Sequence, residues 1–394
     1  MNSTLANSIL SDAKSIESWI VGIRRRLHQC PELLYELHET AGIVTEVLDE
    51  LGISYKSGVA ETGIIATIGT GASPCVMLRA DMDALPIEED VDVEFKSRNP
   101  GKMHACGHDC HTAMLLGAAK ILKQQESELK GTVKFCFQPA EEGGAGAKRM
   151  CDEGIMQSPS VDKVFGIHVW PMIPTGQLTG RPGPFLAASN SFRIVVKGKG
   201  GHAAMPHLSI DPVTTAAQIV SQAQTIVSRE QDPLEAAVIS FTTIHGGSAF
   251  NVIPSEVAIE GTIRALSTEG HQKLTKRLEE VAKAVAESYR CEAEFEMSGE
   301  PYPVTSNDPE LWEEVHSMGE SVVGQGNFQL CPPMMGGEDF AFYGEHAQTC
   351  FVALGSGNEK KGCTFGLHHP KFKADESAFP IGTALHVAFV KEHL

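Results

Sequence analysis

Long hydrophobic runs are missing from this sequence of 394 residues. No stretch approaches about 18 consecutive apolar residues, the length that a membrane-spanning helix needs. The N-terminal segment also places Asp, Lys and Glu where a signal peptide would need an apolar core. We therefore expect a protein that is neither secreted nor inserted in a membrane.

Basic residues are scarce, and paired cysteine motifs are absent. The 32 Lys and Arg residues against 50 Asp and Glu residues give a net charge of −18. This charge disfavours binding to nucleic acid or to anionic membranes, and it leaves small molecules as the expected partners. The ten cysteines form no CxxC pair. Scattered thiols in that number are ordinary for an intracellular protein, so we expect a cytoplasmic location.

The length predicts two or three domains, at a typical size of about 150 residues each. Helical periodicity covers residues 15–50 and is interrupted at Cys30-Pro31, which predicts two helices there. Continuous apolar strands are then expected at about 63–68, 75–80, 132–137 and 161–169, and one helix is expected at about 112–125. This pattern indicates an α/β sheet that is covered on both faces.

Residues 188–299 follow a different rhythm. Strands and helices are expected in the order βαββαβ, the split βαβ unit of ferredoxin-like domains, at 191–197, 211–229, 236–245, 255–264, 268–289 and 292–297. From about residue 302 the α/β rhythm returns. The sequence therefore predicts a discontinuous first domain, of residues 1–187 and 301–394, with a second domain inserted at 188–300.

The densest group of reactive side chains lies between Met103 and His111. The segment MHACGHDCH holds three His, two Cys and an Asp. Cys106 and His108 flank a Gly that lets the loop fold back, so both could bind one metal ion, and a following helix would make the loop rigid. A polar helix cap with incidental histidines is the alternative interpretation.

Other donors follow apolar runs or lie in a later loop. They are Asp81 and Asp83, Glu141 and Glu142, His168, and the adjacent His368 and His369. Taken singly, they are also explained as an acidic turn, a cap, a core histidine or an ordinary loop. Taken together, five segments bring S, N and O donors to one edge of a sheet, which predicts a metal site.

These motifs resemble the dinuclear metallo-amidohydrolase and carboxypeptidase family that contains aminoacylases, hippurate hydrolases and plant auxin-conjugate amidohydrolases. The resemblance runs in order from about Arg25 to about Lys373. It is carried by the segments RRRLHQCPELLYELHET, LRADMDALPI, HACGHDCHTAM, FQPAEEGGAGA, GIHVWP, GGHAAMPHLSIDP, GGSAFNVIP, MMGGEDFAFY and GLHHPKF. It implies an α/β protein with a mixed-sheet, metallopeptidase-like catalytic domain and an inserted ferredoxin-like domain that serves as lid and dimerisation domain.

The resemblance also implies roles at the metal site. Two divalent ions per subunit, Zn²⁺ or Mn²⁺ with Co²⁺ or Ni²⁺ as alternatives, would be bound by Cys106, His108, Glu142, His168 and His368. Cys106 would be the shared ligand, Asp83 would orient another ligand, and Glu141 would be the general base. His368 is preferred over His369 because the family ligand directly follows the Leu.

Residues of the inserted domain and of a later loop receive roles from the same resemblance. His202 would reach the active site of the partner subunit in a homodimer and stabilise the oxyanion, while Asn251, Arg264 and Gly337 would contact the substrate. A guanidinium suits a substrate carboxylate. A strand-edge salt bridge for Arg264 and a turn-forming role for Asn251 are the ordinary alternatives.

The implied reaction is hydrolysis of the amide bond of an N-acyl amino acid by a water that bridges two metal ions and is deprotonated by Glu141. A carboxypeptidase or dipeptidase on the same fold is the alternative, since it would share the attacking water and the carboxylate contact. Two remoter alternatives are a cysteine hydrolase, with Cys106 as nucleophile, and a non-catalytic protein that binds a metal or an amino acid. The sequence does not identify the acyl group or the amino acid.

Overall fold

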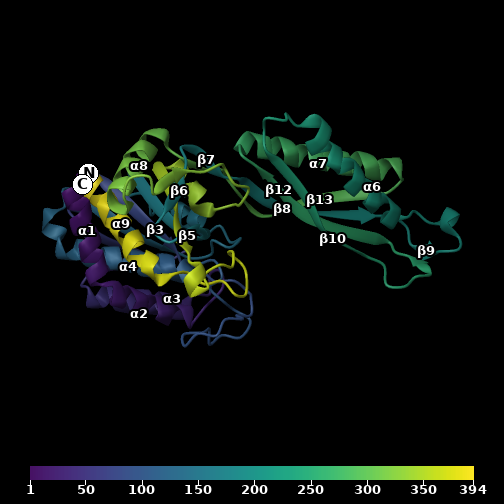
Figure 1. Ribbon diagram of the computed structural model, residues 1–394. Helices are drawn as coiled ribbons and strands as arrows, with labels where there is room; N and C mark the ends of the chain where they lie inside the picture. Colours follow the sequence, from purple (N-terminus) through teal and green to yellow (C-terminus); the bar gives the residue numbers. More distant parts are fainter. The chain divides into compact units, whose positions relative to one another are not determined.

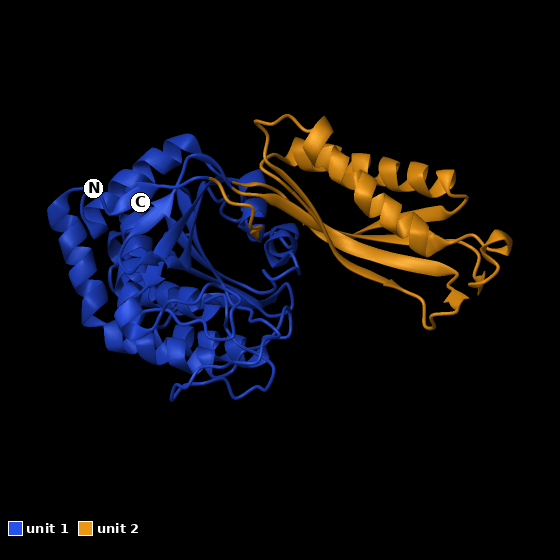
Figure 2. Ribbon diagram, turned by 45° about the vertical axis from the view of Figure 1, so that its right-hand side comes forward, with its two compact units in different colours: residues 1–185, 306–332, 339–394 blue, residues 186–305, 333–338 orange.

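The computed structural model describes residues 1–394 and divides into two compact units (Figure 1, Figure 2). Unit 1 contains Met1–Phe185, Ser306–Pro332 and Asp339–Leu394, and unit 2 contains Leu186–Thr305 and Pro333–Glu338. The short segment 333–338 thus clusters with unit 2, although it follows the expected insertion by some distance along the chain. The domain boundaries drawn from the sequence remain a prediction.

Unit 1 is built on a mixed eight-stranded sheet with the order β1-β2-β4-β3-β5-β16-β6-β15. Its strands are β1 (Ser54–Val59), β2 (Gly63–Gly69), β3 (Cys75–Asp81), β4 (Thr132–Gln138), β5 (Lys163–Pro174), β6 (Leu178–Gly180), β15 (Phe328–Leu330) and β16 (Gln348–Gly357). Its helices are α1 (Ser3–Ser15), α2 (Glu17–His28), α3 (His38–Glu50), α4 (His108–Gln124), α5 (Gly146–Asp152), α8 (Pro309–Val323) and α9 (Phe379–His393). Two further short strands, β7 (Gly183–Leu186) and β14 (Thr305–Asn307), lie at the unit boundaries.

Both faces of this sheet are covered. On β5, the Phe165 ring stacks on Phe389 of α9. The next residue, Gly166, faces the opposite side, where Phe340 of the short helix η4 (Asp339–Glu345) lies so close that a Cβ would meet its ring at 2.7 Å. Every residue of β3 and β4 is accordingly buried. This arrangement confirms the α/β sheet, covered on both faces, that the continuous apolar strands predict, and the mixed sheet that the family resemblance implies.

The parallel registers align the strand ends that carry the predicted donors. β3 pairs with β4 so that Asp81 lies opposite Gln138, and β5 pairs with β3 so that Arg79 lies opposite Gly166. His168 is two residues beyond Gly166 and is therefore level with Asp81. The carboxyl ends of β3 and β4 thus lie level with His168, which is inside β5 because this strand continues to Pro174. The carboxyl ends of parallel strands are where α/β proteins place their sites.

Unit 2 is a four-stranded antiparallel sheet, ordered β10-β12-β8-β13, with two helices packed on it. Its elements are β8 (Ala188–Lys197), α6 (Pro212–Thr225), β10 (Ala237–Gly246), β12 (Glu256–Ala265), α7 (Thr268–Ser288) and β13 (Glu292–Tyr302). The order βαββαβ confirms the expected ferredoxin-like arrangement. Two short strands, β9 (Gly201–His202) and β11 (Val252–Ile253), pair separately.

Three helices differ from the sequence prediction, and the short α5 is one that is not predicted. Helix α1 is not predicted, because polar residues interrupt the short apolar stripe that it buries. Asn2 caps this helix by accepting a hydrogen bond from the Leu5 N–H at 2.9 Å. Helix α4 begins at His108, one turn before the predicted Thr112, because its first turn is polar and lacks apolar periodicity. No helix combines the length and the apolar character that a membrane crossing requires.

Close helix packing in unit 1 predicts opposite effects of two Gly→Ala substitutions. A Cβ at Gly382 of α9 would collide with the sulfur of Met114 in α4, whereas a Cβ at Gly22 of α2 would meet nothing within 4 Å. We expect Gly382→Ala to lower the free energy of unfolding by about 1–3 kcal/mol. Gly22→Ala should raise it by about 0.5–1 kcal/mol. Urea unfolding measures both, and equal effects would contradict the packing.

Candidate metal centre

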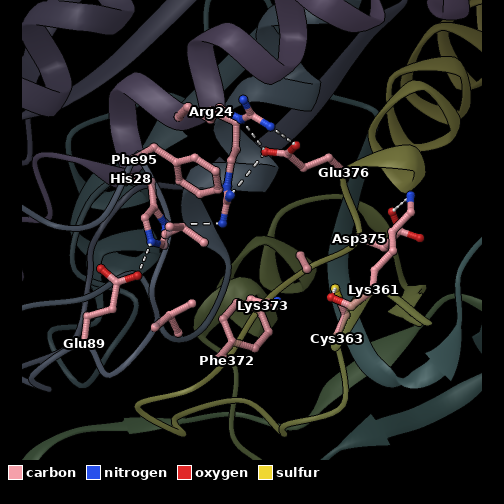
Figure 3. Close-up of a pocket in the computed structure, with 14 residues that line it drawn as sticks. Arg24, His28, Glu89, Phe95, Lys361, Cys363, Phe372, Lys373, Asp375 and Glu376 are labelled. Carbon is pink, nitrogen blue, oxygen red and sulfur yellow. Dashed lines mark hydrogen bonds and ion pairs between the residues drawn. The ribbon is translucent and has the colours of Figure 1, made fainter. Parts of the chain in front are cut away.

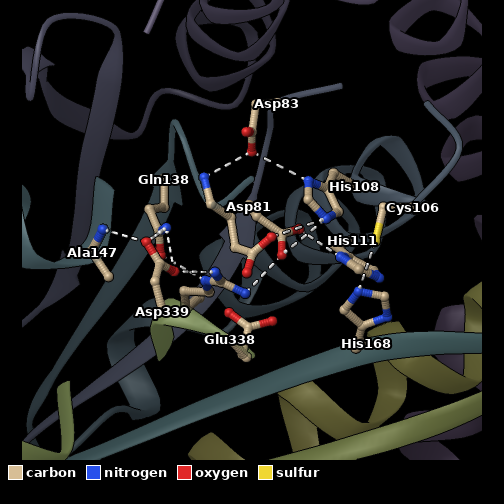
Figure 4. A network of polar contacts seen from close by, with 12 residues as sticks. Asp81, Asp83, Cys106, His108, His111, Gln138, Ala147, His168, Glu338 and Asp339 are labelled. Carbon is tan, nitrogen blue, oxygen red and sulfur yellow. Dashed lines mark hydrogen bonds and ion pairs between the residues drawn. The ribbon is translucent and has the colours of Figure 1, made fainter. Parts of the chain in front are cut away.

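A turn at Gly107 brings Cys106 and His108 to the same buried position (Figure 4). Gly107 has a left-handed φ of 88° immediately before α4, and a Cβ there would collide with the Val169 side chain. Only glycine combines this conformation with so close an approach to β5. The glycine between the two donors is therefore required by the local geometry.

Two groups of donor atoms share the Cys106 sulfur. One consists of Cys106, His108 and His168, and the other of Cys106, Glu142 and His368; within each group the donor atoms lie within 4.8 Å of one another. The Cys106 Sγ is 3.4 Å from His168 Nε2. The structure thus brings together all five residues expected to bind metal ions, and their assignment as ligands remains a prediction.

The His168 imidazole is held in the neutral form. Its Nδ1–H donates to the Val169 carbonyl oxygen at 2.8 Å, so the Nε2 lone pair is free on the side of Cys106. Burial, together with the nearby His111, lowers the pKa of His168 well below its usual range. A neutral imidazole with one free lone pair is the form that coordinates a cation.

His368, and not His369, lies at the second donor group. The His368 N–H donates to the Ala105 carbonyl oxygen at 2.9 Å, and the His368 Nε2 is 3.2 Å from a Glu142 oxygen. His369 instead stacks on Phe365, with 4.5 Å between the ring centroids. The structure therefore places only the first of the two adjacent histidines beside Glu142.

Asp83 fixes the acidic turn that follows β4. One of its carboxylate oxygens accepts the Glu141 N–H and the other accepts the Glu142 N–H, both at 3.0 Å. The first oxygen also lies 3.3 Å from His108 Nδ1. Glu141 in turn has a carboxylate oxygen within 4.8 Å of the donor atoms of His108 and Glu142. Asp83 thus orients both glutamates and one imidazole.

Asp81 belongs to a buried polar network that sequence reasoning missed (Figure 4). Its carboxylate accepts from Arg79 at 2.7 Å and from His111 Nδ1 at 2.6 Å, while His111 Nε2 accepts the Val169 N–H at 2.8 Å. Arg79 also donates to Asp339 at 3.0 Å. The network ties β3, α4 and β5 together. Its sequence signal is a charged residue, Arg79, inside an otherwise apolar strand.

A second buried network contacts Asp109, the neighbour of His108, beside a cavity of about 320 Å³ (Figure 3). His28 lies between two carboxylates, with Nδ1 2.6 Å from Asp109 and Nε2 3.1 Å from Glu89. Burial and the nearby Arg24 lower the pKa of His28, but the two carboxylates outweigh them and raise it above its usual value. The His28 imidazole, between the two carboxylates, therefore holds the start of α4 against α2.

The donor set fits divalent cations. A thiol, imidazoles and carboxylates together suit Zn²⁺ and are compatible with Mn²⁺ or Co²⁺. Burial lowers the pKa of His108, but Asp81 and Asp83 outweigh it and raise the pKa to about 10. The buried His108 Nε2 nevertheless makes no hydrogen bond, and it lies 3.6 Å from an Asp81 oxygen and 4.0 Å from a Glu141 oxygen. A buried N–H that makes no hydrogen bond is unfavourable, and a cation in place of this proton removes that cost.

The residues expected to bind substrate form two separate pairs in unit 2. Arg264 is half-buried and donates to the Met335 carbonyl oxygen at 2.8 Å, and a Cβ on Gly337 would lie 3.8 Å from its Nη1. His202 and Asn251 lie together where β9 pairs with β11. The structure therefore joins Arg264 with Gly337, and His202 with Asn251.

The two pairs lie toward opposite ends of strand β12. Arg264 is near the end of the strand and Glu256 begins it, so the eight residue steps between them span about 26 Å. β11 directly precedes β12 along the chain and pairs with β9, which lies at one end of unit 2 (Figure 1). One substrate of amino-acid size therefore cannot contact both Arg264 and His202 of the same chain.

Comparison with known proteins places this fold and donor set in a family. The model of peptidase family M20/M25/M40 matches residues 77–392. The chain belongs to this family and is a hydrolase. The resemblance to a metallo-amidohydrolase and carboxypeptidase family, drawn from the sequence motifs, is thereby confirmed.

Three similar proteins cover nearly the whole chain. IAA-amino acid hydrolase ILR1-like 4 of Arabidopsis thaliana is 45% identical over 379 residues, or 95% of this chain and 86% of the relative. Thermostable carboxypeptidase 2 of Saccharolobus solfataricus is 41% identical, with 97% of each chain covered. The solved structure of the Bacillus subtilis YXEP protein, a dinuclear metal binding peptidase of the M20 family, is 34% identical, has a TM-score of 0.81 and covers 97% of this chain and 99% of its own.

Metal binding is expected to release protons from Cys106 and His108. Burial, together with Glu142 and Glu141, raises the pKa of Cys106 well above its usual value, and the pKa of His108 is about 10, so both groups carry a proton near neutral pH. The apparent affinity for Zn²⁺ should therefore rise with pH from about 6 to 9. Calorimetry in buffers of different protonation enthalpy measures the release.

A pair of cysteine variants identifies the source of these protons. Cys106→Ser should release about one proton fewer per chain than the unsubstituted protein. Cys110→Ser is the matched control, because Cys110 is also buried but belongs to neither donor group. An unchanged release in Cys106→Ser would show that the thiol does not lose its proton to the metal.

Proposed function

We propose that the protein is a metal-dependent amidohydrolase that cleaves the amide bond of N-acyl amino acids. The observation that carries this proposal is that two donor groups share Cys106 while the Glu141 carboxylate lies beside them. The relative named IAA-amino acid hydrolase adds support, because its name describes hydrolysis of an amino acid conjugate. The partners of the protein are accordingly small molecules.

The two donor groups are proposed to hold two divalent cations per subunit. Zn²⁺ or Mn²⁺ is expected, and Co²⁺ or Ni²⁺ would also suit the donors. When bound, such ions polarise the amide carbonyl and lower the pKa of the attacking water. The proposed ligands are Cys106, which is shared, and His108, Glu142, His168 and His368. The Bacillus subtilis relative described as dinuclear supports the number of ions.

Glu141 is the proposed general base. Its side chain is buried, and Asp83 holds its backbone N–H, so the position of the carboxylate is restricted. The carboxylate accepts a proton from the attacking water and later passes this proton to the nitrogen of the departing amine. Glu142 has the same chemistry, but it faces His368 and is assigned to the ligands.

Arg264 is proposed to bind the carboxylate of the amino acid. Burial lowers the pKa of its guanidinium, and the group donates to a carbonyl oxygen instead of pairing with an acidic side chain. A half-buried guanidinium without an acidic partner can bind a carboxylate through two parallel hydrogen bonds. Gly337, which borders Arg264, lets a ligand approach the backbone closely.

His202 is proposed to act, with Asn251 beside it, in the active site of the partner subunit of a homodimer. The Ala204 N–H donates to His202 Nδ1 at 3.1 Å, so the neutral imidazole carries its proton on Nε2. This Nε2–H is exposed and can donate to the oxyanion that forms at the carbonyl. Because Arg264 and His202 of one chain are too far apart for one substrate, a second copy must supply one of them.

A metallo-carboxypeptidase or dipeptidase is the second candidate, favoured by the similarity to thermostable carboxypeptidase 2. The same base, ligands and guanidinium would serve that reaction. The difference lies on the acyl side of the scissile bond, where a peptide carries another amino acid and an acyl conjugate does not. The choice between the two is therefore a question of what binds the acyl group.

A cytoplasmic location is also proposed. All ten cysteines are free thiols. Free thiols in this number are typical of a reducing compartment.

Removal and replacement of the metal tests the reaction. We expect activity to vanish on chelation and to return on loading with Zn²⁺, Mn²⁺ or Co²⁺, with N-acetyl and N-benzoyl amino acids cleaved faster than dipeptides. Glu141→Gln should keep its metal content and lose about 10³-fold in kcat. Faster cleavage of dipeptides would favour the carboxypeptidase or dipeptidase, and full activity in Glu141→Gln would refute the role of the base.

Mixing two defective variants tests the exchange of His202 between subunits. Glu141→Gln lacks the base and His202→Ala lacks the donor, so both homodimers should be nearly inactive. A mixed dimer has one complete site, with Glu141 from one chain and His202 from the other. Random exchange makes about half of the dimers mixed, so about a quarter of the normal activity should appear. Mixed dimers that form, as shown by mass measurement, and remain inactive would contradict this role.

A further inference from the structure

An exposed aromatic side chain lies at the tip of unit 2 that carries His202. Phe250 is 100% exposed. With Asn251 it occupies the two central positions of a turn, which is closed by the Val252 N–H donating to the Ala249 carbonyl oxygen at 3.3 Å. Val252 pairs in turn with His202. The turn therefore presents Phe250 and Asn251 next to each other beside β9.

The fold of unit 2 does not use this ring. Phe250 is absent from the apolar cluster of unit 2 and from the side chains packed against it. Met205, Leu208 and Val252, which lie near it on the same tip, are also exposed. Exposed apolar side chains forgo the hydrophobic gain of burial, and a group of them beside a polar donor is typical of a binding surface.

We propose that Phe250 of the partner subunit forms an apolar wall of the acyl pocket and selects substrates with an aromatic acyl group. This inference rests on the proposed function, in which His202 of the partner subunit reaches the carbonyl oxygen of the substrate. On the amino acid side of that carbonyl, Arg264 of the first subunit binds the carboxylate. The acyl group is therefore the part of the substrate that faces the partner's tip.

The turn geometry assigns the phenyl ring to this role. Phe250 and Asn251 are adjacent, with Cα atoms about 3.8 Å apart, so a turn that enters the site with His202 brings the ring with it. A phenyl ring can stack on or meet edge to face with an aromatic acyl group, whereas an acetyl group offers it one methyl. The side chain thus distinguishes acyl groups by their size and apolar surface.

The direct measure is the ratio of kcat/KM for an N-benzoyl amino acid to kcat/KM for the N-acetyl form of the same amino acid. We expect Phe250→Ala to lower this ratio by about 10-fold or more. Phe250→Leu should retain most of the ratio, because the side chain stays large and apolar. An unchanged ratio in Phe250→Ala would overturn the proposal.

The matched control is Leu234→Ala. Leu234 is 93% exposed in the same unit. It precedes β10, whose first residue Ala237 pairs with Ala265 near Arg264, so Leu234 lies away from β9. The ratio should stay at its normal value in this variant. An equal fall in Leu234→Ala and Phe250→Ala would attribute the effect to general loss of apolar surface and overturn the proposal.

Mixed dimers determine which subunit's site Phe250 serves. In one mixture Phe250→Ala is combined with Glu141→Gln, in the chain that supplies His202 to the complete site. In the other mixture it is combined with His202→Ala, in the chain that supplies Glu141. We expect the ratio to fall in the first mixture only. A fall in the second only, or an equal fall in both, would overturn the proposal.

Two outcomes separate this inference from the proposed function. If the mixed dimers that keep Phe250 are inactive, His202 does not act in the partner's site, and this inference fails together with that role. Active mixed dimers whose ratio does not depend on Phe250 would overturn the inference alone. Sedimentation velocity completes the test, because a monomeric Phe250→Ala protein would make Phe250 an interface residue and overturn its place in the acyl pocket.

Discussion

The concentration of carboxylates at one buried edge of the sheet of unit 1 is the constraint on which the rest of the site depends. Asp81, Asp83 and Glu141 are all buried there, and such charges are costly without opposite charge close by. Arg79 offsets Asp81, and a protonated His108 offsets part of the remainder. Divalent cations at the proposed donor groups would complete this compensation, and metal binding would then be coupled to the stability of this edge.

The two adjacent glutamates differ in their surroundings and not in their side-chain chemistry. Glu141 and Glu142 are the same residue type on one turn, and Asp83 holds the backbone N–H of each with a different carboxylate oxygen. Both carboxylates lie within 4.8 Å of the His108 donor atom and of each other, but only Glu142 is also grouped with Cys106 and His368, whereas Glu141 is also grouped with Glu338 and Asp339. A ligand and a base can therefore come from consecutive positions.

Much of this could be predicted from the sequence, because β3 is an apolar run, interrupted only by Arg79, that ends at Asp81, and β5 carries His168 inside an apolar run. The βαββαβ order of unit 2 likewise follows from local periodicity. The links from Asp81 to His111 and from His28 to Asp109 could not. They join residues 30 and 81 positions apart, and they depend on strand register and helix placement that no local pattern specifies. The position of His368 beside Glu142 likewise depends on the conformation of a loop.

The length of β12 has a thermodynamic consequence under the proposed arrangement. A ligand that contacts Arg264 of one chain and His202 of another binds only the associated form. Association of the two chains raises the affinity for such a ligand by some factor. By linkage, the ligand raises the affinity of the chains for each other by the same factor. The catalytic output per chain then depends on how much of the protein is present, and at low abundance the substrate itself becomes the agent that assembles the enzyme.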